Sequence, residues 1–153
     1  MSITPLSFKS SFEENPKLAK PASKLRSLLI SIEKKGIPAS VESKINEIIT
    51  GVNEFPGPDP LLIKQIKLAK TSILKLLEKE LNIFPKNHFQ TQWMALGMSV
   101  FGLPMGVAFG LSFGNLAFLG IGIPFGMAIG IAVGNSKDKE VEKEGRQLDW
   151  GGE

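Results

Sequence analysis

The sequence predicts an all-α protein, built as a two-span transmembrane helical hairpin with glycine zippers that follows a small helical cytoplasmic region. Three observations lead to this prediction. No Asp, Glu, Lys or Arg occurs from Asn87 to Ser136. Inside that block, a fourteen-residue pattern with glycine at every fourth position occurs twice, at 102–115 and 122–135. The preceding residues 1–92 carry fourteen Lys/Arg and nine Asp/Glu, with apolar residues at helical intervals.

The first part of the chain divides into two predicted regions. Residues 1–20 show no apolar periodicity, so we expect them to be disordered. The region 21–84 is predicted to be helical and cytoplasmic, with helices at about 22–35, 39–52 and 60–82. Gly36 is placed to end the first helix, Asp59 to cap the third, and Asn82 to end it.

The third predicted helix is strongly basic. It carries an apolar face together with Lys64, Lys67, Lys70, Lys75 and Lys79. A basic amphipathic helix next to a membrane span is typical of a segment that lies on anionic lipid headgroups. The alternative is an ordinary solvated face over a small helical core, and the sequence leaves both open.

The apolar block from Trp93 to Gly134 is 42 residues long, and its polar side chains are Ser99, Ser112 and Asn115. One membrane span requires roughly 20 apolar residues. We therefore predict a transmembrane hairpin at 85–135, with spans at about 93–113 and 116–134. A buried core hairpin in a soluble protein is the alternative, but the rest of the chain is too small to cover it.

The regular glycine spacing predicts close helix packing. Residues four apart lie nearly above one another on a helix, so each repeat forms a groove without side chains. Small residues let helix backbones approach closely in lipid, where van der Waals contact replaces the hydrophobic drive. The predicted packing residues are Gly102, Gly106, Gly110, Gly114, Gly122, Gly126, Gly130 and Gly134.

Each predicted span also contains a proline. Pro104 and Pro124 remove a backbone hydrogen bond and free the carbonyls of Val100 and Gly120, so both are predicted helix kinks. Broken helices at mid-membrane also form ion sites in transporters. Coupled transport usually needs an intramembrane charge, and the block has none, so a kink that only shapes the hairpin is the favoured interpretation.

The flanks of the block predict its orientation. Lys86 precedes it and the charged C-terminal tail, 136–153, follows it, whereas the turn at Asn115 carries no charge. Basic residues stay on the cytoplasmic side, so both termini are expected there. The predicted membrane-interface residues are Phe89, Trp93, Lys137 and Lys139.

The composition argues against several classes of function. The chain has no cysteine, which excludes disulfides, thiolate chemistry and a lipidated cysteine anchor. Its N-terminal stretch lacks an apolar core, so no secretory signal peptide is expected. His88 is the one histidine, and the carboxylates show no defensible pairing. We therefore expect no catalytic residues, no metal site, no cofactor and no nucleic-acid partner.

Three segments together resemble a group of small bacterial glycine-zipper membrane proteins. They are "FPKNHFQTQWMALGM", the two glycine repeats, and the tail "GNSKDKEVEKEGRQLDW" with its Glu144–Asp149 motif. The resemblance covers roughly residues 84–149. It implies a membrane location in a bacterial setting, hence the inner membrane, but no chemical activity.

Two functions follow as hypotheses. The first is a non-enzymatic integral membrane protein that homo-oligomerises through its glycine faces. It would serve as a scaffold or as a platform for an unknown protein partner of the cytoplasmic helices. The second is an oligomeric channel or membrane-permeabilising protein. A soluble or peripheral enzyme ranks last. Residues 146–149 are taken as a solvated end of the tail rather than as a recognition site.

Overall fold

The computed structural model describes residues 3–7 and 16–152, and it is helical apart from two very short strands. The chain forms two compact units, one of residues 1–85 with 148–153, the other of residues 86–147. The elements of the first unit are α1 (Pro16–Lys35), α2 (Ala39–Asn53), α3 (Asp59–Leu81) and β1 (Phe84–Pro85). Those that follow are α4 (His88–Gly97), η1 (Met98–Gly102), α5 (Leu103–Ser112), η2 (Leu116–Phe118), α6 (Leu119–Lys143) and β2 (Gln147–Leu148).

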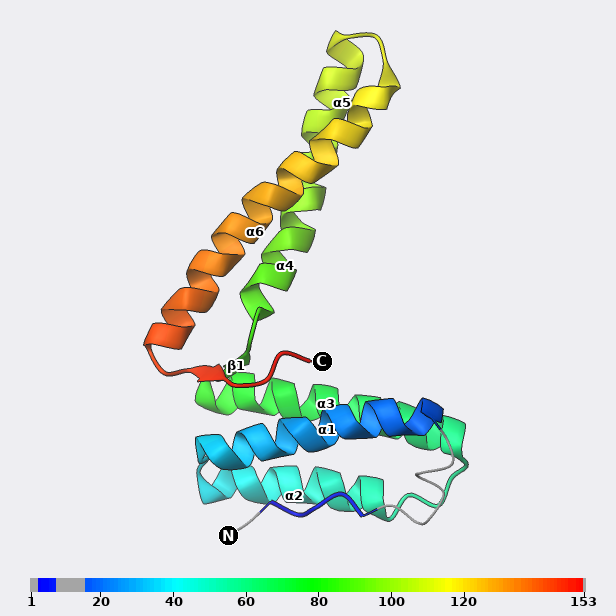
Figure 1. The fold of residues 1–153 in the computed structure, drawn as a ribbon, viewed down its shortest axis with the longest axis vertical. Helices are drawn as coiled ribbons and strands as arrows, with labels where there is room; N and C mark the ends of the chain where they lie inside the picture. The colour runs from blue at the N-terminus through cyan, green and yellow to red at the C-terminus, as the bar shows by residue number, and fades with distance from the viewer. Residues whose placement is uncertain (1–2, 8–15, 153) are drawn as a thin grey trace. The chain divides into compact units, whose positions relative to one another are not determined.

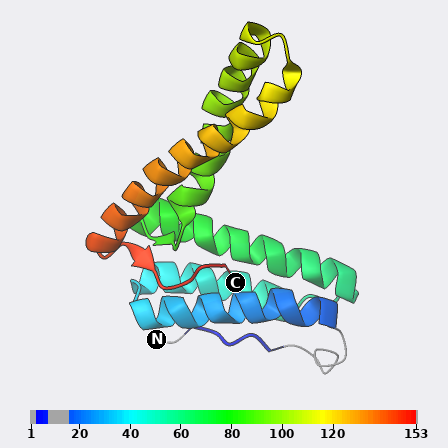
Figure 2. The same cartoon turned by 45° about the horizontal axis from the view of Figure 1, so that its top comes forward.

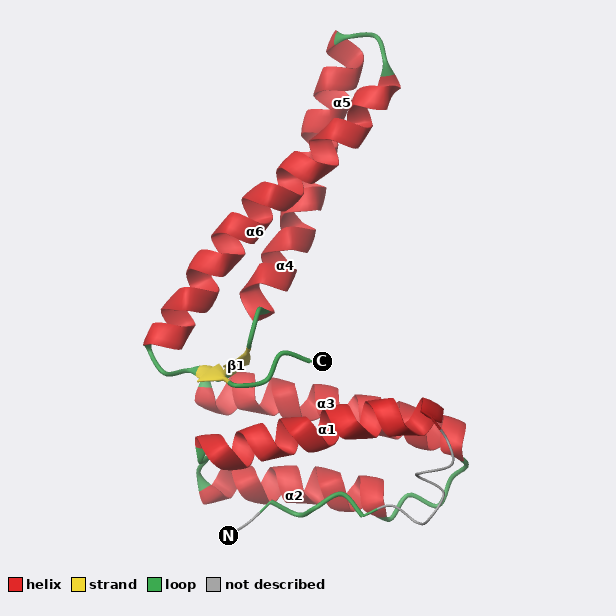
Figure 3. Ribbon diagram, viewed as in Figure 1, coloured by secondary structure: helices red, strands yellow, loops and turns green. Residues whose placement is uncertain are grey.

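The first unit is a three-helix bundle in which α1 and α2 both pack against α3 (Figures 1 and 3). Each helix turns one apolar face inward, as the three- and four-residue spacing predicts. The side chains that close the core are almost completely buried: Leu25, Leu28, Ile32, Ile45, Ile49, Ile66, Ile73 and Leu77.

The ends of these helices follow the local sequence signals. Gly36 has φ +69° just after α1, and Asn82 has φ 51° just after α3, so both occupy the left-handed conformation that ends helices. At the other end of α3, Asp59 is the first helical residue instead of a cap before it. The helix α1 begins at Pro16, ahead of the predicted residue 22, and continues through Pro21.

The N-terminal segment is more ordered than the sequence predicts. Residues 3–7 are extended, with the Thr4 N–H donating to Asn46 Oδ1 at 2.7 Å and the Ser7 N–H to Asn53 Oδ1 at 3.1 Å. The Leu6 side chain is buried in the bundle core. The prediction of disorder for 1–20 is therefore wrong at 3–7 and 16–20. Its remaining residues, 1–2 and 8–15, lie outside the described part.

The C-terminal residues also join the first unit. Leu148 and Trp150 are buried among the core residues of the bundle. The Trp150 indole N–H donates to Ser27 Oγ at 2.9 Å, and the Ser31 hydroxyl donates to the Asp149 carbonyl at 2.9 Å. The interpretation of 146–149 as a solvated end is wrong at Leu148, because the tail supplies apolar side chains to a core that the sequence assigned to α1–α3 alone.

The second unit consists of two long helices that pack along each other (Figure 2). Helices α4, η1 and α5 are continuous from His88 to Ser112, and α6 returns beside all three. The structure thus begins the first helix five residues before the predicted Trp93. It begins the second at Leu119, because residues 116–118 form a 3₁₀ turn.

Within the described residues, His88–Ser112 is the single helix long and apolar enough to cross a membrane, with a mean hydropathy of 1.7. Two such spans were expected. The helix α6 does not qualify among the described residues; its apolar part ends at Gly134, and charged residues follow from Lys137 to Lys143. Its apolar part, from Leu119 to Gly134, is about 24 Å long at 1.5 Å per residue.

Candidate membrane-inserting helix pair

Glycines form the contact between the two helices of the second unit. On α6, the residues Gly122, Gly126, Gly130 and Gly134 are all buried. A β-carbon added at Gly126 would lie 2.7 Å from Gly102 Cα, and one at Gly130 would lie 2.8 Å from Met94 Cα. The corresponding distance from Gly134 to the Phe89 carbonyl oxygen is 2.6 Å. No side chain fits at these positions without separating the helices.

The first helix meets α6 through Gly97 as well as through its glycine repeat. A β-carbon at Gly97 would lie 2.9 Å from Gly130 Cα, and one at Gly102 would lie 3.0 Å from Ile123 Cα. Gly97 is five residues before Gly102, a spacing that would turn it off the glycine face of a regular α-helix. The intervening segment is the π-helical η1, whose i→i+5 hydrogen bonding includes the Leu103 N–H to the Met98 carbonyl. The wider turn brings both glycines to α6.

The remaining predicted packing residues divide into two groups. Gly106 and Gly110 of α5 are buried. A β-carbon at Gly122 would lie 2.6 Å from Gly106 Cα, so Gly106 belongs to the contact. Gly114 does not, because it is exposed in the turn after α5, with φ +64° and open space where a β-carbon would be. There, glycine provides backbone freedom and not a packing surface.

The two prolines are accommodated differently. Ahead of Pro104 the helix widens into η1, whose span includes Val100, the residue whose carbonyl a proline at this position leaves free. Prolines and π turns are both recognised causes of helix interruption. At Pro124, by contrast, α6 continues as an α-helix. Both proline side chains are exposed, on faces away from the glycine contact.

The outer surface of the helix pair is apolar. Its exposed fractions reach 73% at Leu111 and 65% at Phe113. Other large apolar side chains that are exposed on this unit are Leu96, Val100, Phe101, Leu103, Val107, Phe109, Ile121, Phe125, Ile129 and Val133. This is the reverse of a water-soluble helix pair, which buries its large side chains and exposes its polar ones.

A buried carboxylate closes the charged end of the pair. Asp138 of α6 is 7% exposed, and its two oxygens accept the backbone N–H groups of Phe89 at 3.0 Å and Gln90 at 2.9 Å. The first N–H groups of a helix have no partner within it, and they favour negative charge. Asp138 therefore caps α4 from the neighbouring helix.

The sequence reasoning missed this cap, although a signal was present. Asp138 follows Gly134 by four residues, which continues the buried spacing of α6. The predicted interface residues lie nearby in different settings. The Lys137 ammonium is 5.7 Å from the Trp93 ring centroid, within the range of a cation–π contact. Phe89 is half-buried in the first turn of α4, and Lys139 is exposed.

The opposite end of the pair is an aromatic turn. Asn115 Oδ1 accepts the Ala117 N–H at 2.9 Å, a local bond that fixes the turn. The Phe113 ring packs against Phe109 and Phe118, with centroid distances of 6.4 and 4.9 Å. These rings line an apolar pocket of about 260 Å³ together with Met105, Ile121 and Phe125.

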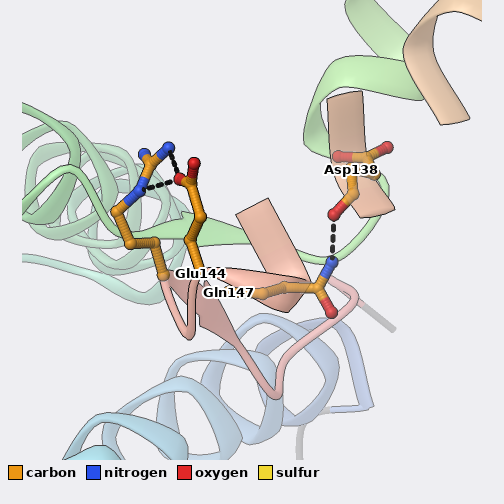
Figure 4. Close-up of polar contacts among 4 residues, drawn as sticks. Asp138, Glu144 and Gln147 are labelled. Carbon is orange, nitrogen blue, oxygen red and sulfur yellow. Dashed lines mark hydrogen bonds and ion pairs between the residues drawn. The ribbon is translucent and has the colours of Figure 1, made fainter. Parts of the chain in front are cut away.

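Figure 4 shows the polar contacts of the segment that follows α6. The Gln147 amide donates to the Asp138 carbonyl at 3.4 Å, and the Arg146 Nε–H donates to Glu144 Oε2 at 2.7 Å. Gly145, with φ +67°, turns the chain out of the helix. These contacts fold the end of the second unit back on α6.

The described residues contain no group of three His, Asp or Glu that could hold a metal ion. His88 stacks edge-on against Phe89, with ring centroids 5.1 Å apart. No protein-family model, no curated protein and no solved structure matches the chain.

Proposed function

We propose that this chain is an integral membrane protein without catalytic activity. Its helix pair enters the bilayer as a two-span hairpin and holds the three-helix bundle at the membrane surface as a platform for a protein partner. The observation that carries the proposal is the inverted distribution of side chains in the second unit. Glycine lies at the helix contact and large apolar residues lie outside. Lipid is the medium in which such a surface is stable.

The two ends of the helix pair support a hairpin topology. The carboxylate of Asp138 on α6 bonds to the first turn of α4, so the chain enters and leaves the unit at one end. Trp93 and Lys137 lie near this end, and such residues are enriched at the interface between lipid and water. Both termini then lie on one side, which the flanking lysines assign to the cytoplasm. The resemblance to bacterial glycine-zipper proteins implies that this membrane is the bacterial inner membrane.

The length of α6 is compatible with insertion. Its apolar part is about 24 Å long, somewhat less than the hydrocarbon core of about 30 Å. A short span is accommodated by local thinning and by flanking lysines whose charged ends reach the interface. Residues Lys137, Lys139 and Lys143 follow the apolar part of α6 and are suited to this.

Glycine faces can join several copies of the chain or the two helices of one copy. They were expected to join several copies, yet in the structure they contact each other within one chain. We therefore propose that the glycines close the hairpin. Any homo-oligomer would then form through the outer apolar surface.

Single-cysteine labelling tests this topology cleanly, because the chain has no native cysteine. We expect Asn115→Cys in intact cells to react with a membrane-impermeant maleimide from outside. Lys75→Cys should react only after permeabilisation, and Phe125→Cys should stay protected in both conditions. Carbonate washing should leave the protein in the membrane fraction. Labelling of Phe125→Cys in intact cells, or release by carbonate, would overturn the proposal.

A further inference from the structure

The three-helix bundle carries a basic groove between α1 and α3. It encloses about 600 Å³ and is lined by Pro16, Lys17, Lys20, Pro21, Lys24, Ile66, Lys67, Lys70 and Thr71. Five of these nine residues are lysines. In a chain whose bases and acids are nearly balanced overall, this local excess of positive charge is distinctive.

The two helix segments that line the groove contain no carboxylate side chain. No Asp or Glu occurs from Pro16 to Ile32 of α1 or from Pro60 to Leu77 of α3. The two helices pack against each other, so these stretches face one another across the groove. The ammonium groups of Lys20, Lys24, Lys67 and Lys70 therefore raise the local positive potential, and no carboxylate is among the residues that line the groove.

The C-terminal segment positions the two inner lysines. The Lys24 ammonium donates to the Gly152 carbonyl at 2.7 Å, and the Lys70 ammonium lies 5.9 Å from the Trp150 ring centroid. Both lysines are half-buried, whereas Lys20 and Lys67 are exposed at the rim. An ammonium has three N–H donors, so one bond to a carbonyl leaves others for a ligand. The groove thus has two half-buried lysines, Lys24 and Lys70, that contact the C-terminal segment, and two exposed lysines, Lys20 and Lys67, at its rim.

We propose that this groove binds a ligand with clustered phosphate groups. Several ammonium groups around one depression match the charge and the many acceptor oxygens of phosphates. Ile66 and the two prolines provide apolar contact beside them. The same chemistry is offered by an anionic phospholipid headgroup and by a soluble diphosphate. The proposal is independent of the membrane topology, because the groove lies wholly within the bundle.

Titration of the full-length protein in dodecyl maltoside separates these two sources. In a Trp93→Phe background, Trp150 is the remaining tryptophan and reports on the groove through its contact with Lys70. The probes are inorganic pyrophosphate and mixed micelles containing phosphatidylglycerol, with phosphatidylcholine micelles as the zwitterionic control. A response to pyrophosphate supports a soluble ligand. A response to phosphatidylglycerol alone supports a lipid headgroup.

The decisive comparison uses two pairs of substitutions that remove the same charge. Lys20→Gln with Lys67→Gln alters the groove, whereas Lys75→Gln with Lys79→Gln alters exposed lysines of α3 outside it. We expect the groove pair to weaken binding about tenfold or more and the control pair less than about twofold. Equal losses in both pairs would show a diffuse charge effect and overturn the proposal. So would the absence of any response to either phosphate probe.

Discussion

At the scale of single residues, the two helices of the second unit pack closely because the residues at their contact are glycines, which have no side chain. Gly122, Gly126, Gly130 and Gly134 of α6 each face backbone atoms of the other helix at distances that leave no room for a methyl group. The stabilising contribution comes from many close van der Waals contacts, each about 0.1–0.2 kcal/mol. Intrinsic helix propensity opposes it, by roughly 1 kcal/mol for each glycine relative to alanine in water.

Replacing a contact glycine should be far more damaging than replacing an exposed alanine. Gly126→Leu must push the α6 backbone away from Gly102, since an added β-carbon would lie 2.7 Å from Gly102 Cα. Overpacking of this kind costs about 1–3 kcal/mol. Ala128→Leu, two residues further on an exposed face, is the matched control. Thermal melting in detergent should show a lower midpoint for Gly126→Leu only, and equal responses would contradict glycine-mediated packing.

Asp138 gives a second prediction at this scale. Asp138→Ala removes the acceptor of two backbone N–H groups in the first turn of α4. Leaving such groups unsatisfied costs about 1–3 kcal/mol. We expect faster amide hydrogen exchange at Phe89 and Gln90 together with a lower melting midpoint. The exposed neighbour Glu140→Ala should change neither, and unchanged exchange in Asp138→Ala would show that the cap is dispensable.

At the scale of elements, the π turn η1 sets the register of the helix pair. The glycine spacing from 102 to 110 and from 122 to 134 was visible in the sequence, because four-residue intervals map directly onto a helix face. The role of Gly97 was not visible. Gly97 precedes Gly102 by five residues, and this spacing puts both residues on the same helix face only where the helix is π-helical. Sequence periodicity assumes one helical pitch, so it overlooks residues placed by a local change of pitch.

Deleting one residue should distinguish the π turn from its surroundings. Removing Ser99, which is exposed within η1, should convert the π turn into regular α-helix and place Gly97 four residues before Gly102. Removing Ala108 from α5 should instead rotate everything before it by about 100° relative to Gly110. We expect the Ser99 deletion to retain most of its thermal stability and the Ala108 deletion to lose cooperative melting. Similar damage from both would contradict a register role for η1.

At the scale of the whole molecule, the chain closes the three-helix bundle with both of its terminal segments. The helix faces of the bundle were predictable, because Leu and Ile recur at helical spacing in α1, α2 and α3. The contributions of Leu6, Leu148 and Trp150 were not predictable, since isolated apolar residues outside a helix carry no periodicity. The charged tail was likewise assigned as one segment, yet its first half extends α6 and its last residues belong to the bundle core.

The buried indole of Trp150 should therefore be essential to the bundle. Trp150→Ala removes a side chain that is 7% exposed and hydrogen-bonded to Ser27, at a cost of about 3–5 kcal/mol. Trp150→Phe keeps most of the packing but removes the indole N–H donor. Its free energy of unfolding should therefore fall by only about 1 kcal/mol, the net contribution of one hydrogen bond. Thermal melting followed by circular dichroism should give the lowest midpoint for Trp150→Ala and a midpoint between that value and the wild-type one for Trp150→Phe. Limited proteolysis should release the C-terminal residues from Trp150→Ala first, because the segment from Leu148 onward loses its anchor. Wild-type resistance in Trp150→Ala would mean that the tail is held by its backbone bonds alone.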